Sequence, residues 1–429
     1  MEMKKYRRFL CKAITFIFLV SNLLVSLPDM QIVFAADKGN KDEKIKYQDR
    51  DKTEIIVKYK DGKAGENVKK RVKQSLKLAK FEEKKKYNRF KLDVLEVGKS
   101  DNINNVIDML KSDPDVEYVQ PNYKLEIQAL PSDARFNEQW GLLNNGQEIE
   151  GHAGRTGVDI NAANAWNITK GTSSVVIGIL DTGIDINHND LKSSIFKNTG
   201  EIAGNNIDDD NNGYIDDING WDFVNADNTV YDSGSLDLHG THVAGIIAAS
   251  ANNEGISGVA PDVRLLPLKF INGNWGYTCD AIDAIEYAMS MGVKIMNCSF
   301  GGTDNNFALK DTMVNSGILY VCSAGNRGAD VSVSPDIPNV LSVASIDSMG
   351  VISPYSSYGN KIHAAAPGIN ILSTTPDNTY DYFSGTSVSA PFVTGTAALL
   401  KSHVPSLNHE QLSLRIKANV VPCTNLQGK

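Results

Sequence analysis

From residue 139 onward, short apolar runs of strand length alternate with longer segments in which apolar positions recur with helical spacing. The strand-like runs cover residues 175–181, 263–270, 293–298, 318–323 and 340–346, and the helix-like segments cover 239–250, 278–291, 305–316 and 387–403. This alternation predicts an α/β fold, a doubly wound parallel sheet with helices on both faces. Right-handed crossovers would bring the C-terminal ends of the strands to one edge, where such folds bind ligands.

The pattern before residue 128 is different. Strand-like runs occupy residues 54–59, 91–97 and 116–119, with an extended stretch at 123–127, and helix-like segments occupy 64–86 and 103–112. This order predicts a separate small α+β domain ahead of the larger one.

The first 35 residues have the pattern of a secretory signal. Several basic residues precede an apolar run from Ala13 to Leu27, and Val33-Phe34-Ala35 resembles a cleavage site before Ala36. A transmembrane anchor is the alternative, but a run of about 15 residues is short for a membrane span of ~20. We therefore expect export, and no membrane attachment after the signal is removed.

Charge divides the 429-residue chain unevenly. The net charge is −8, but residues 129–429 carry 15 basic and 31 acidic residues, a balance of −16. Such an acidic body disfavours nucleic-acid binding and is compatible with bound cations.

One serine stands between a small-residue turn and a helix-like run, in the segment Gly385-Thr386-Ser387. A serine hydroxyl becomes a good nucleophile when a base removes its proton, and free N–H groups at a helix start can stabilise an oxyanion. His239, at the start of another small-residue helix, is a candidate base, and Asp181 follows a buried strand. These three residues predict acyl transfer through a serine ester.

Two other readings of this region remain. Asp185 is an alternative carboxylate four residues after Asp181, and His239 with His242 could instead hold a metal ion. No third nitrogen or sulfur ligand follows at the spacing of a zinc finger, which argues against the metal.

Four segments together resemble the signatures of the subtilisin-like serine proteases, the subtilases. They are Asp-Thr-Gly-Ile at 181, His-Gly-Thr-His-Val-Ala-Gly at 239, Ser-Ala-Gly-Asn at 323 and Gly-Thr-Ser-x-x-Ala-Pro at 385. Their order is also that of subtilisin. The resemblance implies that Ser387 is the nucleophile, His239 the general base and Asp181 its orienting carboxylate. It further implies that the Asn326 amide and the Ser387 N–H hold the oxyanion.

The resemblance also implies a secreted precursor. Residues 1–35 would be the signal peptide, 36–128 a ferredoxin-like propeptide and 129–429 the peptidase domain. The run from Val116 to Asn122 looks like the closing motif of such propeptides, which template folding and inhibit the protease until cleavage. We expect that cleavage between Tyr123 and Asp133. The family usually continues beyond the position of Lys429, so we expect the last C-terminal elements to be missing here.

Substrate binding can be placed in the same way. The segment Ser299-Phe300-Gly301-Gly302 resembles the family strand whose backbone pairs with an extended protein or peptide substrate. Arg327 follows the oxyanion asparagine where relatives often carry an acid. We therefore expect it to disfavour basic residues at P1, the position before the scissile bond.

Calcium is the expected cofactor. An acidic segment between Asp181 and His239 alternates oxygen ligands in the manner of a compact EF-hand loop, with a glycine at its sixth position. The expected ligands there are Asp208, Asp210, Asn212, the Tyr214 carbonyl and Asp217. A second site, looser in its resemblance, would use Gln139, Asp190 and the loop that begins at Asn252.

Two other functions fit the same motifs. A subtilase-like binding module without activity would be expected to lack a triad residue, and none is missing here. A transpeptidase or cyclase would use the same acyl-enzyme with an amine acceptor in place of water.

Overall fold

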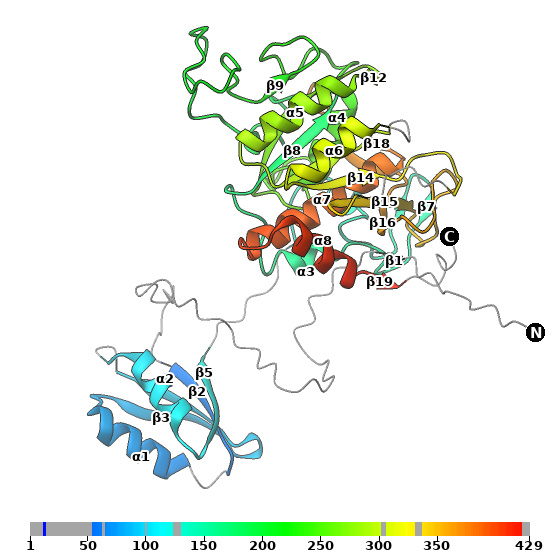
Figure 1. Ribbon diagram of the computed structural model, residues 1–429. Coiled ribbons are helices and arrows are strands. Elements are labelled where there is room, and N and C mark those ends of the chain that lie inside the picture. Colours follow the sequence, from blue (N-terminus) through cyan, green and yellow to red (C-terminus); the bar gives the residue numbers. More distant parts are fainter. Residues whose placement is uncertain are drawn as a thin grey trace, which may run out of the picture. The chain divides into compact units, whose positions relative to one another are not determined.

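The computed structural model describes residues 12–13, 54–61, 65–98, 101–122, 130–301, 306–330 and 337–422. The described residues 54–122 and 130–422 belong to two compact units, and each is described by itself below (Figure 1).

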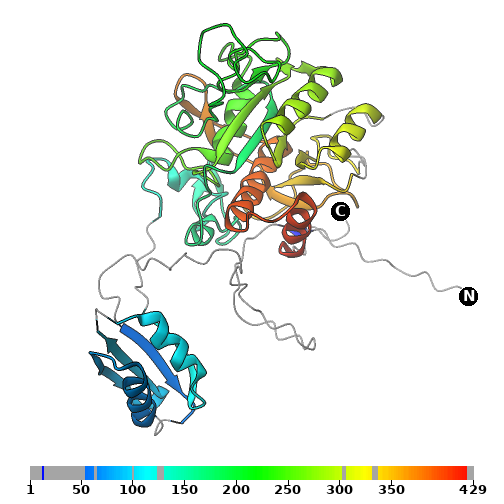
Figure 2. The ribbon, with the colours of Figure 1, turned by 60° about the vertical axis from the view of Figure 1, so that its left-hand side comes forward.

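The smaller unit is an antiparallel sheet with two helices. Its elements are β2 (Glu54–Tyr59), α1 (Gly65–Leu76), β3 (Phe81–Tyr87), β4 (Leu92–Val97), α2 (Ile103–Ser112) and β5 (Val116–Pro121), with a 3-10 turn at Asn88–Phe90. The strand order is β3-β4-β2-β5, and the chain can be followed by colour in Figure 2. Buried residues of β2, both helices and the other strands share one core, so α1 and α2 cover the same face.

The long helix expected at 64–86 is wrong in its second half. Helix α1 stops at Leu76, the next residue, Lys77, has a positive φ of 47°, and residues 81–87 form the edge strand β3. Of that strand only Phe81 is buried. Glu and Lys favour a helix locally, but here pairing with β4 prevails, because propensity is a weak signal that tertiary contacts override. The stretch expected to be extended at 123–127 lies outside the described residues.

Seven parallel strands form the sheet of the larger unit, as predicted. In spatial order they are β16 (Ala364–Pro367), β15 (Val340–Ile346), β14 (Leu319–Ser323), β13 (Ile295–Cys298), β8 (Val176–Asp181), β10 (Arg264–Lys269) and β9 (Trp221–Asp222). The short β1 (Lys12–Ala13) and β19 (Val421–Pro422) extend the sheet beyond β16.

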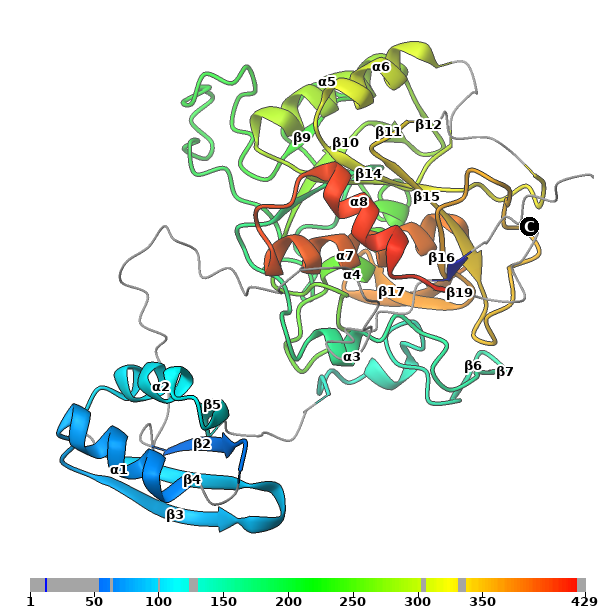
Figure 3. The ribbon, with the colours of Figure 1, turned by 60° about the horizontal axis from the view of Figure 1, so that its bottom comes forward.

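Helices cover both faces of this sheet, which confirms the doubly wound prediction (Figure 3). One core contains residues of α3 (Ala162–Ala165), α4 (Leu238–Ala248), α7 (Thr386–His403) and α8 (His409–Ala418), and the other contains residues of α5 (Thr278–Ser290) and α6 (Phe307–Asn315). Alternate positions of β8 face the two cores: Ile177 and Ile179 join the first and Leu180 the second. The sheet is therefore buried on both faces, as its continuous apolar strands require.

Shorter elements, which the periodicity did not predict, complete the unit. The antiparallel hairpin β17 (Ile371–Thr375) and β18 (Thr379–Phe383) packs beside α4. The pairs β6 (Glu148–Ile149) with β7 (His152–Ala153) and β11 (Ile271–Asn272) with β12 (Trp275–Gly276) form small ribbons, and a 3-10 turn covers Phe136–Glu138.

Candidate active site

Asp181 and His239 meet where strand β8 ends and helix α4 begins. The Nδ1 atom of His239 lies 2.7 Å from Oδ1 of Asp181, and the backbone N–H of Thr182 donates to the same oxygen at 2.8 Å. Asp181 is 1% exposed, whereas the His239 side chain is 34% exposed and so is open on one side. Burial lowers the pKa of His239, but the charge and hydrogen bond of Asp181 outweigh it and raise the pKa above its usual value.

Ser387 lies in the first turn of α7 with donors gathered around it. A Cβ added at Gly385 would lie 3.1 Å from Ser387 Oγ, 3.4 Å from Asn326 Nδ2 and 3.7 Å from Ser387 N, so these three atoms converge on one small space. The Asn326 Oδ1 atom accepts hydrogen bonds from the backbone N–H and the hydroxyl of Thr386, both at 2.9 Å. The amide is therefore fixed with its N–H₂ group toward Ser387, as an oxyanion donor requires.

A proline inside α7 explains how the Ser387 backbone is held. Pro391 has no N–H, so the carbonyl of Ser387 four residues earlier lacks the donor that an α-helix normally supplies. The hydroxyl of Ser299 donates to that carbonyl instead, at 2.7 Å. Asn297 in turn donates to the Ser299 hydroxyl at 2.9 Å and accepts from Thr394 at 2.8 Å. Ser299, expected to contact substrate, therefore also fixes the turn that carries Ser387.

The other expected substrate residues are placed unevenly. Gly301 is exposed, with open space where a Cβ would be, and Gly302 lies outside the described residues. Arg327 is exposed beside Asn326.

The two alternative roles find no support in the geometry. The carboxylate of Asp185 accepts backbone hydrogen bonds from Asn187 and Asp377. The His242 ring is fully buried, bonds to backbone carbonyls and stacks on Phe383 at 4.2 Å between centroids. Burial lowers the pKa of His242 to about 3, so this imidazole is a neutral structural group.

Sequence comparison adds to this geometry. The profile of the subtilase family matches residues 172–427, more than half of the chain. This chain belongs to the subtilase family. A second profile, of the fervidolysin N-terminal prodomain, matches residues 35–122. The protein is thus a subtilisin-like serine endopeptidase that carries a prodomain.

Individual relatives agree with this assignment. A thermophilic serine proteinase of Bacillus sp. (strain AK1) is 35% identical over 319 residues, which span 73% of this chain and 69% of that protein. Thermitase of Thermoactinomyces vulgaris is 35% identical over 274 residues, covering 62% of this chain and 88% of its own. Among solved structures, a protease of Pseudoalteromonas arctica superposes with a TM-score of 0.53 at 28% identity, covering 70% of this subtilase and 96% of its own chain.

None of the helices in the described part of this subtilase is long and apolar enough to cross a membrane.

The acidic loop of the subtilase contains a group of carboxylates suited to a metal ion. Ligand oxygens of Glu201, Asp208 and Asp210 all lie within 4.8 Å of one another. Glu201, which the sequence pattern did not single out, is buried and accepts backbone hydrogen bonds from residues 209, 210 and 216. Hard oxygen donors of this kind fit Ca²⁺.

The other residues expected to bind calcium in that loop form hydrogen bonds with protein groups. Asp217 is fully buried, and its two oxygens accept from Asn198 at 2.7 Å and from the Tyr287 hydroxyl at 2.6 Å. The Asn212 side-chain oxygen accepts from the backbone N–H of Tyr214 at 2.8 Å. The Asn198 amide also donates to Oδ2 of Asp210 at 2.9 Å, so it links Asp217 to the group of Glu201, Asp208 and Asp210.

Of the three residues expected in the second calcium site, the structure brings Asp190 and Asn252 into contact. Asp190 accepts from the Asn252 amide at 3.1 Å and from the Tyr380 hydroxyl at 3.0 Å. Gln139 instead pairs with the backbone of Ser257, donating to its carbonyl at 2.7 Å and accepting from its N–H at 2.9 Å.

A carboxylate that the sequence reading missed, Asp133, approaches the same loop. It accepts from the backbone N–H groups of Asn252 and Asn253, and from the Ser257 hydroxyl at 2.7 Å. Its position ahead of the first core element gave no periodic signal that could have identified it.

Proposed function

We propose that this protein is a secreted precursor whose peptidase domain hydrolyses peptide bonds of proteins through an acyl-enzyme on Ser387. His239 removes the proton from Ser387 Oγ as that oxygen attacks the substrate carbonyl, and it later returns a proton to the leaving amine. Asp181 fixes the imidazole tautomer and stabilises the imidazolium. The observation that carries the proposal is the 2.7 Å contact between His239 Nδ1 and Asp181 Oδ1, which leaves Nε2 free to act as base.

The oxyanion that forms on the substrate carbonyl needs donors already in place. The amide of Asn326 and the backbone N–H of Ser387 would supply them, since both atoms converge beside Ser387 Oγ. Donors fixed in this way need no rearrangement when charge develops, and so they stabilise the transition state more than the bound substrate.

Substrate would bind as an extended strand along Ser299, Gly301 and Gly302, with main-chain hydrogen bonds providing affinity. We assign Arg327 to the mouth of the P1 pocket, where its charge repels Lys and Arg and tolerates acidic residues. Equal turnover at low salt of matched peptides with Lys or Glu at P1 would contradict this assignment.

Maturation would follow from the domain order. We assign residues 1–35 to a signal peptide, 36–128 to a propeptide that inhibits the protease in cis, and 129–429 to the peptidase domain. Support comes from the prodomain match at 35–122 and from the compact unit at 54–122.

We assign Ca²⁺ to two places in the peptidase domain. Asp208, Asp210 and Glu201 would hold one ion, with Asn212, the Tyr214 carbonyl and Asp217 shaping or completing the site. Asp190 and Asn252 would hold a second ion, with Asp133 and Gln139 alongside. A bound ion would neutralise neighbouring carboxylates and link loops that otherwise repel one another.

Expression of residues 36–429 with Ca²⁺, beside a Ser387→Ala variant, tests the proposed function. We expect self-cleavage between residues 123 and 133 and new activity on an unfolded protein, both absent from the variant. If both proteins stay full length, folded and inactive, the protein is a binding module with a subtilase fold and the proposal is wrong.

A further inference from the structure

Lys269 is a fully buried cation directly beside the catalytic dyad. It is the last residue of β10, and in the sheet register it pairs with Asp181 at the end of β8. Burying an ammonium group is costly unless it is paired. Its partners therefore indicate what the charge does.

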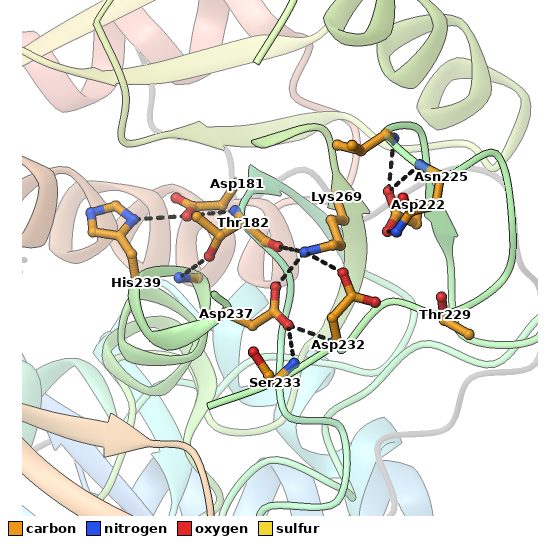
Figure 4. A network of polar contacts seen from close by, with 12 residues as sticks. Asp181, Thr182, Asp222, Asn225, Thr229, Asp232, Ser233, Asp237, His239 and Lys269 are labelled. Atoms are coloured by element: carbon orange, nitrogen blue, oxygen red, sulfur yellow. Dashed lines mark hydrogen bonds and ion pairs between the residues drawn. The ribbon is translucent and has the colours of Figure 1, made fainter. Parts of the chain in front are cut away.

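The ammonium group contacts both the loop that follows Asp181 and the residues that precede His239. Its Nζ donates to the backbone carbonyl of Thr182 at 2.6 Å and to Oδ1 of Asp237 at 2.5 Å, and it lies 3.2 Å from Oδ2 of Asp232 (Figure 4). Burial lowers the pKa of Lys269, but these two carboxylates outweigh it and raise the pKa, so the lysine stays charged.

Thr182 and Asp237 lie close to Asp181 and His239, respectively, along the chain. The N–H of Thr182 donates to Asp181 Oδ1, the same oxygen that contacts His239. Asp237 precedes His239 by two residues at the start of α4, and its other oxygen accepts from backbone N–H groups of Asp232 and Ser233.

The loop after β8 approaches α4 closely enough for such a link. Gly183 has φ of 124°, and a Cβ at this position would lie 2.5 Å from Asp237 Oδ1. A Cβ at Gly240 would lie 2.2 Å from the Gly183 carbonyl oxygen. Only glycines permit this contact, and it brings the Asp181 loop onto the helix that carries His239.

We propose that Lys269 is a positioning residue for catalysis: with Asp237 it ties the loop after Asp181 to the start of α4 and so sets the geometry of the Asp181–His239 pair. The inference rests on the proposed function. Lys269 does not touch substrate. It acts through the peptide of Thr182 on one side and through the carboxylate of Asp237 on the other.

The charge of Lys269 has a second effect. Asp181 and His242 interact electrostatically with His239, and Asp237 lies two residues before it in the chain. While Lys269 neutralises it, the Asp237 carboxylate has little influence on the imidazole. Without the ammonium group, that carboxylate would stabilise the imidazolium and move the acid limb of the pH–rate profile to higher pH.

The test compares Lys269→Met, the double variant Lys269→Met with Asp237→Asn, and Asp222→Asn. The double variant removes the two fully buried charges and leaves only Asp232, whose side chain is 24% exposed and can be solvated, which protects folding. Asp222 is a matched control because it is buried on the neighbouring strand β9, where it pairs with Lys269 in the sheet register. The two charges act on each other, but among the described residues the Asp222 carboxylate accepts hydrogen bonds only from residues 224 and 225. Asp222→Asn should destabilise the same region and remove a neighbouring charge while leaving the contacts of Lys269 Nζ with Thr182, Asp237 and Asp232 in place.

Active serines are counted with a fluorophosphonate, and kcat and KM per labelled site are measured across pH. We expect Lys269→Met to lower kcat by about 10- to 100-fold with KM nearly unchanged, as misplaced catalytic groups do. Its acid limb should rise by about one pH unit, a shift of the size that a nearby unneutralised carboxylate causes. The double variant should keep the kcat defect and lose the upward shift.

The outcomes separate the two proposals. If the wild-type protein is neither labelled nor active, the proposed function itself is wrong. If it is active, but every labelled Lys269 variant has the wild-type kcat and the wild-type acid limb, Lys269 is merely structural and this inference is overturned. The same follows if Asp222→Asn reproduces the kcat and pH changes.

Discussion

Replacing Ser299 by alanine should destabilise the peptidase domain through two buried groups. Ser299 is 5% exposed, and its hydroxyl is the partner of both the Ser387 carbonyl and the Asn297 amide. Each buried polar group left without a partner costs about 1–3 kcal/mol, so we expect Ser299→Ala to lower the free energy of unfolding by about 2–6 kcal/mol.

Pro391 provides a sharper version of this prediction. The Ser387 carbonyl depends on Ser299 because Pro391 cannot donate to it within the helix. In a Pro391→Ala background, the new N–H can take the carbonyl, so Ser299→Ala should leave only the Asn297 amide unpaired. The cost of Ser299→Ala should then fall by about 1–3 kcal/mol, the cost of one unpaired group, and a double-mutant cycle measures this coupling.

Denaturant unfolding followed by tryptophan fluorescence is a suitable assay, because all four tryptophans lie between residues 140 and 275 and report on the peptidase domain. The cycle is measured in a Ser387→Ala background, in which self-digestion is prevented while the Ser387 backbone is kept. An equal cost of Ser299→Ala with Pro391 and with Ala at that position would refute the reasoning.

Three further predictions address the chemistry and the metal. Asn326→Leu should lower kcat by roughly 10²–10³-fold with little change in KM, which is the loss typical of removing one oxyanion donor in a subtilisin. Steady-state kinetics on a peptide ester measure both constants. A rise in KM with an unchanged kcat would show that Asn326 serves substrate binding instead. Because Asp181 raises the pKa of His239, kcat/KM should fall as pH drops through that raised pKa, where the imidazole becomes protonated. A pH–rate profile of the wild-type protein whose acid limb does not lie above the ordinary imidazole pKa would count against the pairing of Asp181 with His239. Glu201→Gln should reduce the Ca²⁺-dependent rise in Tm, measured by calorimetry with and without chelator, because it removes one carboxylate of the group. Glu410→Gln, at an exposed residue of α8, should not reduce it. Equal rises in both variants would remove Glu201 from the metal site.

The sequence predicted the parallel sheet because its strands are apolar on both faces and alternate with helices, a pattern that tertiary contacts reinforce. It predicted helix 64–86 wrongly because residues 81–87 bury only Phe81, so their strand character comes from pairing with β4 and not from their own pattern. Local periodicity carries no record of such pairing.

Motifs identified candidate catalytic residues because their chemistry depends on local turns and helix starts. The buried polar partners were different. Lys269 ends an apolar strand, and Glu201 and Asp133 stand in irregular segments, so their importance appears only when distant residues are brought together. Ser299 was expected at the substrate strand, but its bond to Ser387 depends on a proline in another element.

Covalent labelling tests the central claim most directly. A fluorophosphonate is reacted with the matured protein, and the modified residue is located by peptide mass spectrometry. The account predicts a single label on Ser387, with reaction lost in His239→Ala and with peptidase activity falling in step with labelling. Continued hydrolysis with Ser387 unmodified, or a label on another serine that abolishes activity, would contradict it.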